Sequence, residues 1–171
     1  SRRLGFLPGS TIGNFTPEDA QALLARSTKL LGKGGLFLIG VDLKKSKQIL
    51  DAAYDDGQGV TAAFNLNLLK RMRTELGAEL DEHGFEHVAF YNREQGRVEM
   101  HLEAKGEQTI SLEGQDFTFS DGERIHTESS YKYAPEEFAE MAQRAGFEPK
   151  ALWTDPDGLF SLHLLEVAVN A

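Results

Sequence analysis

The sequence contains no cysteine, which excludes disulfide bonds, thiolate nucleophiles, cysteine-ligated zinc and iron–sulfur clusters. This composition fits a reducing compartment, and we expect a cytoplasmic protein. No apolar run reaches the about 18 residues of a membrane-spanning helix. The first residues also lack the pattern of a signal peptide, although the chain starts at Ser1 rather than Met, which leaves room for an upstream segment.

Positive charge is scarce, because 18 Lys and Arg residues face 27 Asp and Glu residues and the net charge is −9. The basic residues are scattered, and the pair Lys44-Lys45 lies among acidic and apolar neighbours. Proteins that bind nucleic acids or anionic membranes usually carry a basic patch. We therefore expect neither nucleic acid nor a membrane as a partner.

Several catalytic and nucleotide-binding motifs are missing, including G-x-G-x-x-G, the P-loop, G-x-S-x-G and H-E-x-x-H. His83 and His87 have the i, i+4 spacing of metal ligands, but Gly84 interrupts any helix between them. We interpret them as surface or hairpin-entry histidines. Asp155 and Asp157 are explained by the Pro-Asp-Gly turn that contains them. The sequence thus predicts no metal site.

Residues 4–42 predict a strand, a helix and a second strand. Thr16 and Pro17 are typical of a helix start, and Gly32 is typical of a helix end. The helix carries an apolar stripe at Leu23, Leu24, Leu30 and Leu31. The continuous apolar run at 36–41 indicates a strand buried on both faces, as in parallel sheets. This right-handed βαβ unit resembles the second half of a doubly wound sheet.

The middle of the chain, residues 46–133, has a different character and predicts an inserted α+β domain. A polar segment precedes a helix at 60–76, whose apolar positions are spaced by four at Phe64, Leu68 and Met72. Residues 97–104 alternate with period two, which indicates a half-buried antiparallel strand in a hairpin with residues 85–91. Its inward positions are Val98, Met100 and Leu102.

Residues 134–171 return to the α/β pattern. A helix starts at Pro135 and ends at Gly146, and strands at about 147–154 and 159–169 close the chain as a hairpin. The predicted fold class is therefore α/β, with a core made of residues 1–45 and 134–171 and an α+β insertion between them.

Two segments of the sequence are candidates for binding a ligand. Asn14 lies in the loop at the carboxyl end of the first strand, where open α/β sheets bind ligands. Its amide either caps the following helix or holds a ligand. In the second segment, Glu128 and Ser130 point to the same face of an extended chain. A carboxylate beside a hydroxyl suits a ring with two nitrogen sites, and a solvated strand edge is the alternative.

These segments resemble the histidine-specific, S-adenosylmethionine-dependent methyltransferases, which make hercynine (Nα-trimethylhistidine) in ergothioneine biosynthesis. The similar blocks follow in order along essentially the whole chain: 6–15, 39–43, 53–56, 59–65, 97–100, 126–133 and 153–155. The resemblance implies the C-terminal half of a class I (Rossmann-like) methyltransferase sheet with an inserted substrate-binding domain. The co-substrate S-adenosylmethionine (SAM) would then bind mainly to the half that precedes Ser1, with no SAM-binding residue in this chain.

The resemblance also implies six substrate-binding residues: Asn14, Tyr54, Met100, Glu128, Ser129 and Ser130. Asn14 and Tyr54 match the positions that hold the α-amino and α-carboxylate groups of histidine. Glu128 and Ser130 match the pair that binds the imidazole, and Met100 matches a residue that lines the ring pocket. Methyl transfer needs a positioned nitrogen lone pair and no protein nucleophile. The absence of cysteine therefore does not argue against this activity.

Two other hypotheses stay open at this point. One is a related methyltransferase with a different amine acceptor, and the other is a non-catalytic module that binds an amino acid. Whichever hypothesis holds, we expect the isolated chain not to catalyse methyl transfer. We also expect an uncovered apolar strand edge, at Leu4–Leu7 or at Leu36–Val41, that recruits the missing N-terminal half or another copy of the chain.

Overall fold

The computed structural model describes residues 2–168, and contacts within the chain divide it into two compact units. Unit 1 comprises residues 1–45, 93–97 and 129–171, and unit 2 comprises residues 46–92 and 98–128. The first boundary falls where the insertion was expected to begin. Residues 129–133 and the hairpin tip at 93–97 belong to unit 1, whereas we had placed both in the insertion.

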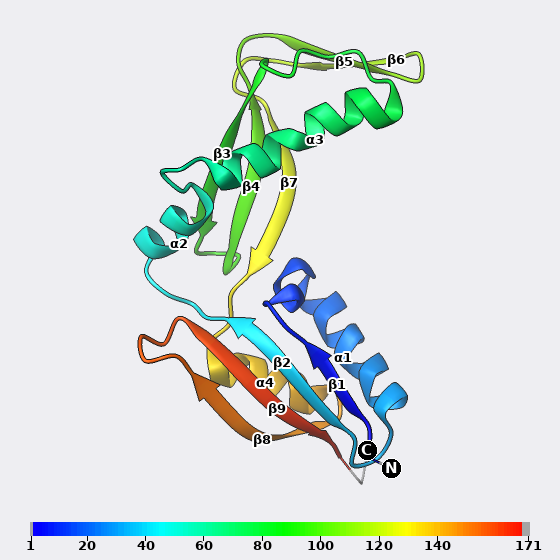
Figure 1. Ribbon diagram of the computed structural model, residues 1–171, viewed down its shortest axis with the longest axis vertical. Helices are drawn as coiled ribbons and strands as arrows, with labels where there is room; N and C mark the ends of the chain where they lie inside the picture. The colour runs from blue at the N-terminus through cyan, green and yellow to red at the C-terminus, as the bar shows by residue number, and fades with distance from the viewer. Residues whose placement is uncertain (1, 169–171) are drawn as a thin grey trace. The chain divides into compact units, whose positions relative to one another are not determined.

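Unit 1 is built on a four-stranded sheet with the order β1-β2-β9-β8 (Figure 1). Its elements are β1 (Leu4–Leu7), η1 (Thr11–Asn14), α1 (Pro17–Leu31), β2 (Leu36–Asp42), α4 (Pro135–Arg144), β8 (Phe147–Thr154) and β9 (Phe160–Val167). Strands β1 and β2 are parallel, and the other neighbours are antiparallel. The predicted βαβ unit and closing hairpin are confirmed, and residue 169 of the predicted last strand lies outside the described residues.

Helix α1 begins and ends as its sequence predicts. The Thr16 side chain accepts a hydrogen bond from the Asp19 amide at 3.2 Å, and Gly32 ends the helix with a φ of 74°. Leu24 is fully buried and Leu23 and Leu31 pack against the core, but Leu30 is 71% exposed, so the predicted apolar stripe was wrong at Leu30. Leu30 lies in the last turn of α1, where the side chain has turned away from the sheet.

Helices α1 and α4 pack against each other, and both cover the same face of the sheet (Figure 1). The core between them contains the fully buried side chains Ile12, Leu24, Ile39, Phe138 and Leu165. Leu38 and Leu164 are paired on the opposite face, where they are half-buried. Leu4 and Phe6 on β1 are each 63% exposed. The sheet therefore has an apolar second face that no helix of the described residues covers.

Strand β1 is one edge of this sheet, because it pairs with β2 on one side only, and β8 is the other edge. The predicted apolar edge thus lies at Leu4–Leu7. The alternative at Leu36–Val41 was wrong, since β2 is paired with β1 on one side and β9 on the other. An exposed apolar edge strand is a surface on which further strands can pair.

Unit 2 contains two helices and two small sheets. Its elements are α2 (Lys47–Tyr54), α3 (Val60–Leu76), β3 (Phe85–Asn92), β4 (Arg97–Ala104), β5 (Gln108–Leu112), β6 (Gln115–Phe119) and β7 (Arg124–Tyr131). The sheets have the orders β3-β4-β7 and β5-β6. Helix α2 was not predicted, because residues 44–58 were interpreted as a polar, glycine-containing segment, yet Ser46 caps the helix by accepting from the Ile49 amide at 3.4 Å. No helix within residues 2–168 is long and apolar enough to cross a membrane.

The buried face of α3 differs from the predicted one. Asn65 is 1% exposed and Leu69 is fully buried, whereas Phe64 is 66% exposed and Leu68 is 37% exposed. The predicted stripe was therefore wrong by one position along the helix for two of its three residues, and only Met72 packs against the core. The error arose because an apolar pattern cannot reveal that a polar asparagine occupies the inward position.

Asn65 is buried because its amide is fully used in hydrogen bonds. Its Nδ2 donates to the His101 carbonyl at 2.9 Å and lies 3.0 Å from His87 Nδ1. Its Oδ1 accepts from Thr127 Oγ1 at 2.7 Å. One side chain on α3 thereby connects the helix to three strands of the sheet.

We expect Asn65→Leu to lower the free energy of unfolding by about 3 kcal/mol, because the substitution leaves buried partners unpaired. The control is Phe64→Ala on the exposed side of the same helix, for which we expect a change within about 0.5 kcal/mol. Urea unfolding followed by circular dichroism measures both. Equal losses in the two variants would contradict the inward position of Asn65.

Candidate functional site

The loop that follows β1 is held at the carboxyl end of the parallel strands. Ser10 has a positive φ of 56°, and its Oγ accepts a hydrogen bond from the Asp42 amide at 2.9 Å. Asn14 ends η1 and is exposed. Because Thr16 caps α1, Asn14 does not. Within residues 2–168 the Asn14 side chain forms no hydrogen bond, which favours the ligand-holding interpretation of its amide.

Gly13 allows this loop to approach strand β7 closely. A Cβ atom at Gly13 would lie 2.7 Å from the Tyr131 carbonyl oxygen, which is closer than real Cβ contacts allow. The η1 turn therefore packs directly against the residue that follows Ser130. Within unit 1 the residues adjacent to Asn14 and Ser130 in sequence, Gly13 and Tyr131, are therefore in close contact.

The segment after Ser130 is fixed by backbone hydrogen bonds on both sides. The Tyr133 amide donates to the Asp42 carbonyl at 3.3 Å, and the Lys44 amide donates to the Tyr133 carbonyl at 3.1 Å. On the other side, the Lys132 amide donates to the Gly96 carbonyl at 2.9 Å. This segment thus forms an isolated parallel β-bridge, Leu43 with Tyr133, beside the end of β2.

A buried ion pair lies at the same end of the sheet. The side chain of Lys132 is 1% exposed, and its Nζ lies 2.7 Å from Asp42 Oδ2. Lys45 Nζ lies 2.6 Å from the other carboxylate oxygen of Asp42. Lys132 Nζ also donates to Ser130 Oγ at 2.8 Å, and Ser130 is 5% exposed. The burial of Lys132 could not be predicted from the sequence, because a lysine in an alternating strand is normally a solvated residue.

The other predicted binding residues lie in unit 2, except for Ser129, which is half-buried in unit 1. Tyr54 is the last residue of α2, and its carbonyl is bonded to His87 Nε2 at 2.8 Å. Met100 is 3% exposed in the middle of β4, and its carbonyl accepts from Thr127 Oγ1 at 3.0 Å. Glu128 is half-buried and follows Thr127 on β7.

His87 has a structural role, which corrects its interpretation as a surface histidine. Its Nε2 must carry the proton, because it meets the Tyr54 carbonyl, and its Nδ1 accepts from the Asn65 amide. Both ring nitrogens are therefore bonded within the protein. The neutral ring fixes the end of α2, and so the position of Tyr54, against β3.

Strand β4 is buried on both faces, although its alternation predicted one solvated face. Glu99 and His101 are 6% and 7% exposed, and with His126 on β7 they place carboxylate and imidazole atoms within 4.8 Å of one another. The His101 ring stacks on Phe90 at 5.4 Å and on His126 at 4.7 Å. Ring-nitrogen lone pairs lie in the ring planes, so two stacked imidazoles do not point at one ion. We interpret the cluster as a stacked polar group.

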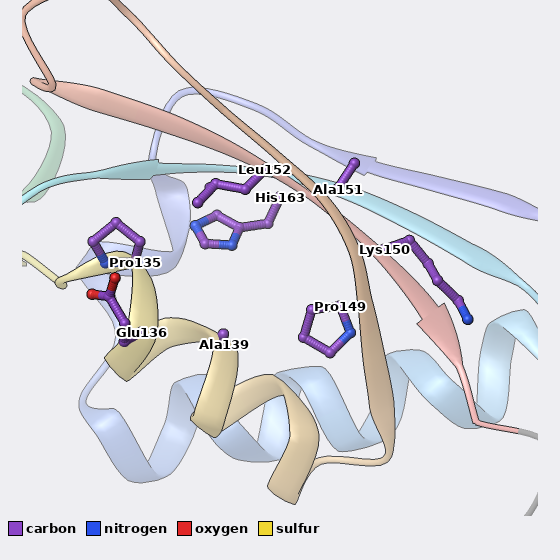
Figure 2. A pocket seen from close by; sticks show the side chains of 8 residues that line it. All are labelled: Pro135, Glu136, Ala139, Pro149, Lys150, Ala151, Leu152 and His163. Atoms are coloured by element: carbon purple, nitrogen blue, oxygen red, sulfur yellow. The ribbon is translucent and has the colours of Figure 1, made fainter.

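A separate cavity of about 320 Å³ lies between α4 and the β8–β9 hairpin (Figure 2). Its lining is mostly apolar, and the ring of His163 points into it beside Leu152 and Pro135 (Figure 2). His163 Nε2 lies 3.1 Å from Ser161 Oγ, which bonds the Val41 carbonyl. Burial lowers the pKa of His163 from 6.5 to about 4, so the ring is neutral near pH 7. None of the predicted binding residues lines this cavity.

We expect His163 to make folding sensitive to acid. Between pH 6.5 and about 4 the unfolded ring binds a proton and the folded ring does not, so stability falls as the pH falls. The loss from this group reaches up to about 3 kcal/mol. Urea unfolding at about pH 7 and about pH 5 should show a smaller drop for His163→Gln than for the wild-type protein. The exposed His83→Gln variant, as a control, should keep the full drop.

Tyr133 and Tyr131 offer a matched pair for a second stability test. The buried Tyr133 hydroxyl has no hydrogen-bond partner among residues 2–168, and burial raises the pKa of this phenol to about 12. The Tyr131 hydroxyl accepts from Arg97 at 2.8 Å. We therefore expect Tyr133→Phe to be neutral or stabilising and Tyr131→Phe to cost about 1 kcal/mol. The opposite order in thermal or urea unfolding would contradict this assignment.

Comparisons with known proteins agree on one family. Residues 1–167 match the sequence model of a family described as histidine-specific, SAM-dependent methyltransferases. The chain is 42% identical over 165 residues to the histidine N-alpha-methyltransferase of Mycolicibacterium smegmatis, covering 95% of this chain and 51% of that protein. The histidine N-alpha-methyltransferase of Mycobacterium tuberculosis is 40% identical over 165 residues, covering 95% of this chain and 51% of that protein. The chain spans about half the length of these curated relatives.

Solved structures support the same fold class. The CcbJ methyltransferase from Streptomyces caelestis superposes with a TM-score of 0.50 at 16% sequence identity. The similarity covers 98% of this chain and 62% of that one. At this level of identity the likeness concerns the fold alone, and it agrees with a partial Rossmann-like methyltransferase sheet.

Proposed function

We propose a function from the premise that the chain belongs to the family of histidine-specific, SAM-dependent methyltransferases. In the whole protein, this chain supplies binding groups for L-histidine, whose α-amino nitrogen accepts three methyl groups from SAM to give hercynine for ergothioneine biosynthesis. The observation that carries the proposal is the loop after β1. Its Asn14 amide is not used in capping, and the loop packs against the strand that carries Ser130.

Each predicted binding residue has a role in this proposal. Asn14 and Tyr54 hold the α-amino and α-carboxylate groups, and Glu128 accepts a hydrogen bond from the imidazole. Ser129 and Ser130 make further contacts with the imidazole ring, and Met100 lines the pocket around it. Methyl transfer requires the amine lone pair to stay in one place while three methyl groups arrive, and anchoring the far end of the substrate achieves this. An amino acid with an apolar side chain would leave the Glu128 carboxylate without a hydrogen-bond donor, which disfavours it as a substrate.

The described residues do not by themselves fit SAM. The acidic side chain at the end of β2, Asp42, is occupied by Lys132 and Lys45, and the turn after β1 packs onto the Tyr131 carbonyl. We therefore assign SAM, the source of the methyl group, to the rest of the whole protein. The cytoplasm is the proposed location of the reaction.

The open face and edge of the unit 1 sheet support a larger parent protein. The exposed Leu4 and Phe6 on the edge strand and the half-buried Leu38 and Leu164 beside them form an apolar surface. In the proposed whole protein, further strands pair with β1 and further helices cover this surface. In the isolated chain, the same edge favours pairing with a second copy.

Glu128→Ala in the whole protein tests the proposed function. We expect kcat/KM for histidine to fall by a factor that corresponds to about 2–4 kcal/mol, because a charged hydrogen-bond partner of the ring is lost. Glu107→Ala, an exposed glutamate of unit 2, is the control and should leave the rate unchanged.

A methyl-transfer assay with histidine and SAM separates the alternatives. Undiminished histidine turnover in Glu128→Ala would rule out the role of Glu128. A wild-type protein that binds histidine without methylating it would indicate an amino-acid-binding module. Methylation of another amine in preference to histidine would indicate a different acceptor.

A further inference from the structure

The cavity between α4 and the β8–β9 hairpin contains one buried polar side chain, His163, which is 3% exposed. Figure 2 shows its ring directed into the space between α4 and β8, with Ala139 on one side and Pro149 on the other. The rest of the lining is apolar except for two residues at exposed positions, Glu136 and Lys150. Ligand sites commonly combine a mostly apolar lining with a few polar groups that orient the ligand.

The hydrogen bonds of Ser161 decide which nitrogen of the His163 ring carries the proton. Ser161 Oγ donates to the Val41 carbonyl at 3.1 Å, and a carbonyl oxygen can only accept. Because the hydroxyl proton is used there, the contact of 3.1 Å between Ser161 Oγ and His163 Nε2 requires the proton of Nε2. Burial lowers the pKa of His163 to about 4, so the ring is neutral near pH 7 and its Nδ1 is an acceptor.

Nδ1 of His163 is not used by the described part of the chain. No hydrogen bond within residues 2–168 goes to this atom. The other contact of the ring is with Phe138, whose ring centroid lies 4.8 Å away at an angle of 60°. Polar atoms of buried side chains are normally paired, because an unpaired one loses hydration without compensation. This acceptor therefore calls for a donor from outside the described residues.

A β-bulge in β8 shapes the wall of the cavity opposite α4. The pairing of β8 with β9 shifts register between Pro149 and Ala151. Because of the extra residue, Pro149 and Leu152, which are three positions apart, share the face towards α4. On the other side, α4 contributes the small side chain of Ala139. The space between them is about 320 Å³, and Leu152 remains 48% exposed beside it.

The size and the charges of the cavity restrict the ligand. An apolar cavity of about 150 Å³ holds one benzene ring, so about 320 Å³ accommodates one or two rings. The Lys150 ammonium group already binds two carboxylates, Glu148 at 3.0 Å and Glu166 at 3.1 Å. The other charged lining residue, Glu136, is exposed. A charged ligand would thus find no buried counter-charge in this lining, which favours a neutral ligand.

We propose that this cavity binds a small, neutral aromatic molecule that donates one hydrogen bond, from an N–H or O–H group, to Nδ1 of His163. A rigid ring covers the apolar side chains of Ala139, Pro149 and Leu152 with little loss of conformational entropy. Its donor satisfies the acceptor at the buried end of the cavity. The site is separate from the proposed histidine site, because none of the residues assigned there lines this cavity.

Indole and benzofuran are matched probes, because they have nearly the same size and shape and only indole carries an N–H donor. Isothermal titration calorimetry of the whole protein measures both, with saturating histidine present to occupy the proposed substrate site. We expect saturable binding of indole with a Kd of about 1 mM or below. Benzofuran should bind about tenfold more weakly, because it leaves Nδ1 unpaired.

Three variants show whether this binding occurs in the cavity. His163→Phe keeps an aromatic ring without the acceptor, so indole should lose about tenfold in affinity and bind like benzofuran. Ala139→Leu fills the cavity from α4 and should abolish the binding of both probes. Glu140→Leu lies on the same helix at an exposed position outside the lining, and it should keep the wild-type affinities. Circular dichroism confirms the folding of each variant.

Histidine-selective 15N NMR of the wild-type protein tests the hydrogen bond without a substitution. The His163 signals, assigned by their loss in His163→Gln, should show the proton on Nε2. The Nδ1 resonance should shift on addition of indole and remain in place with benzofuran.

Several outcomes would overturn the proposal. One is a proton on Nδ1 in the free protein, and another is the lack of saturable indole binding up to about 5 mM. Equal affinities of the wild-type protein for indole and benzofuran would contradict the donated hydrogen bond. Indole binding that Ala139→Leu leaves unchanged would place the ligand elsewhere in the protein.

Discussion

The carboxyl end of the unit 1 sheet depends on the half-buried carboxylate of Asp42. Its two oxygens bind Lys132 and Lys45, while its backbone amide donates to Ser10 and its carbonyl accepts from Tyr133. One residue at the end of β2 therefore fixes both the loop that carries Asn14 and the segment that follows Ser130. Removing one member of such a buried pair leaves an uncompensated charge, so this arrangement is rigid where the proposed substrate needs fixed contacts.

Unit 2 reaches a comparable rigidity with neutral groups. The Asn65 amide connects α3 to β4 and β7, and through His87 it also fixes the end of α2. Each of these polar groups is buried with a partner, and each bond constrains an element that carries a predicted binding residue. The stacked rings of Phe90, His101 and His126 fill the other face of the same sheet. Polar side chains thus hold together a small domain whose apolar core is limited to a few residues.

The second face of the unit 1 sheet is apolar and is not covered by a helix of the described residues. A sheet whose strands are apolar on both faces is stable only when both faces are covered. Helices α1 and α4 cover one of them, and Leu38 and Leu164 lie on the other. Together with the exposed edge at β1, this surface supports the assignment of SAM binding to the rest of a larger protein.

The sequence by itself determined the order of the elements of unit 1, since caps, glycines and periodicity are local signals. The bounds of α1, α3 and β8 follow from them, as does the βαβ unit, and the family resemblance rests on contiguous motifs. Only the tertiary structure decided which side chains face inward. Asn65 rather than Phe64 is buried in α3, and Lys132 lies in the interior beside Asp42. A polar residue is buried when distant partners satisfy its hydrogen bonds, and those partners come from strands and loops that no local pattern links to it.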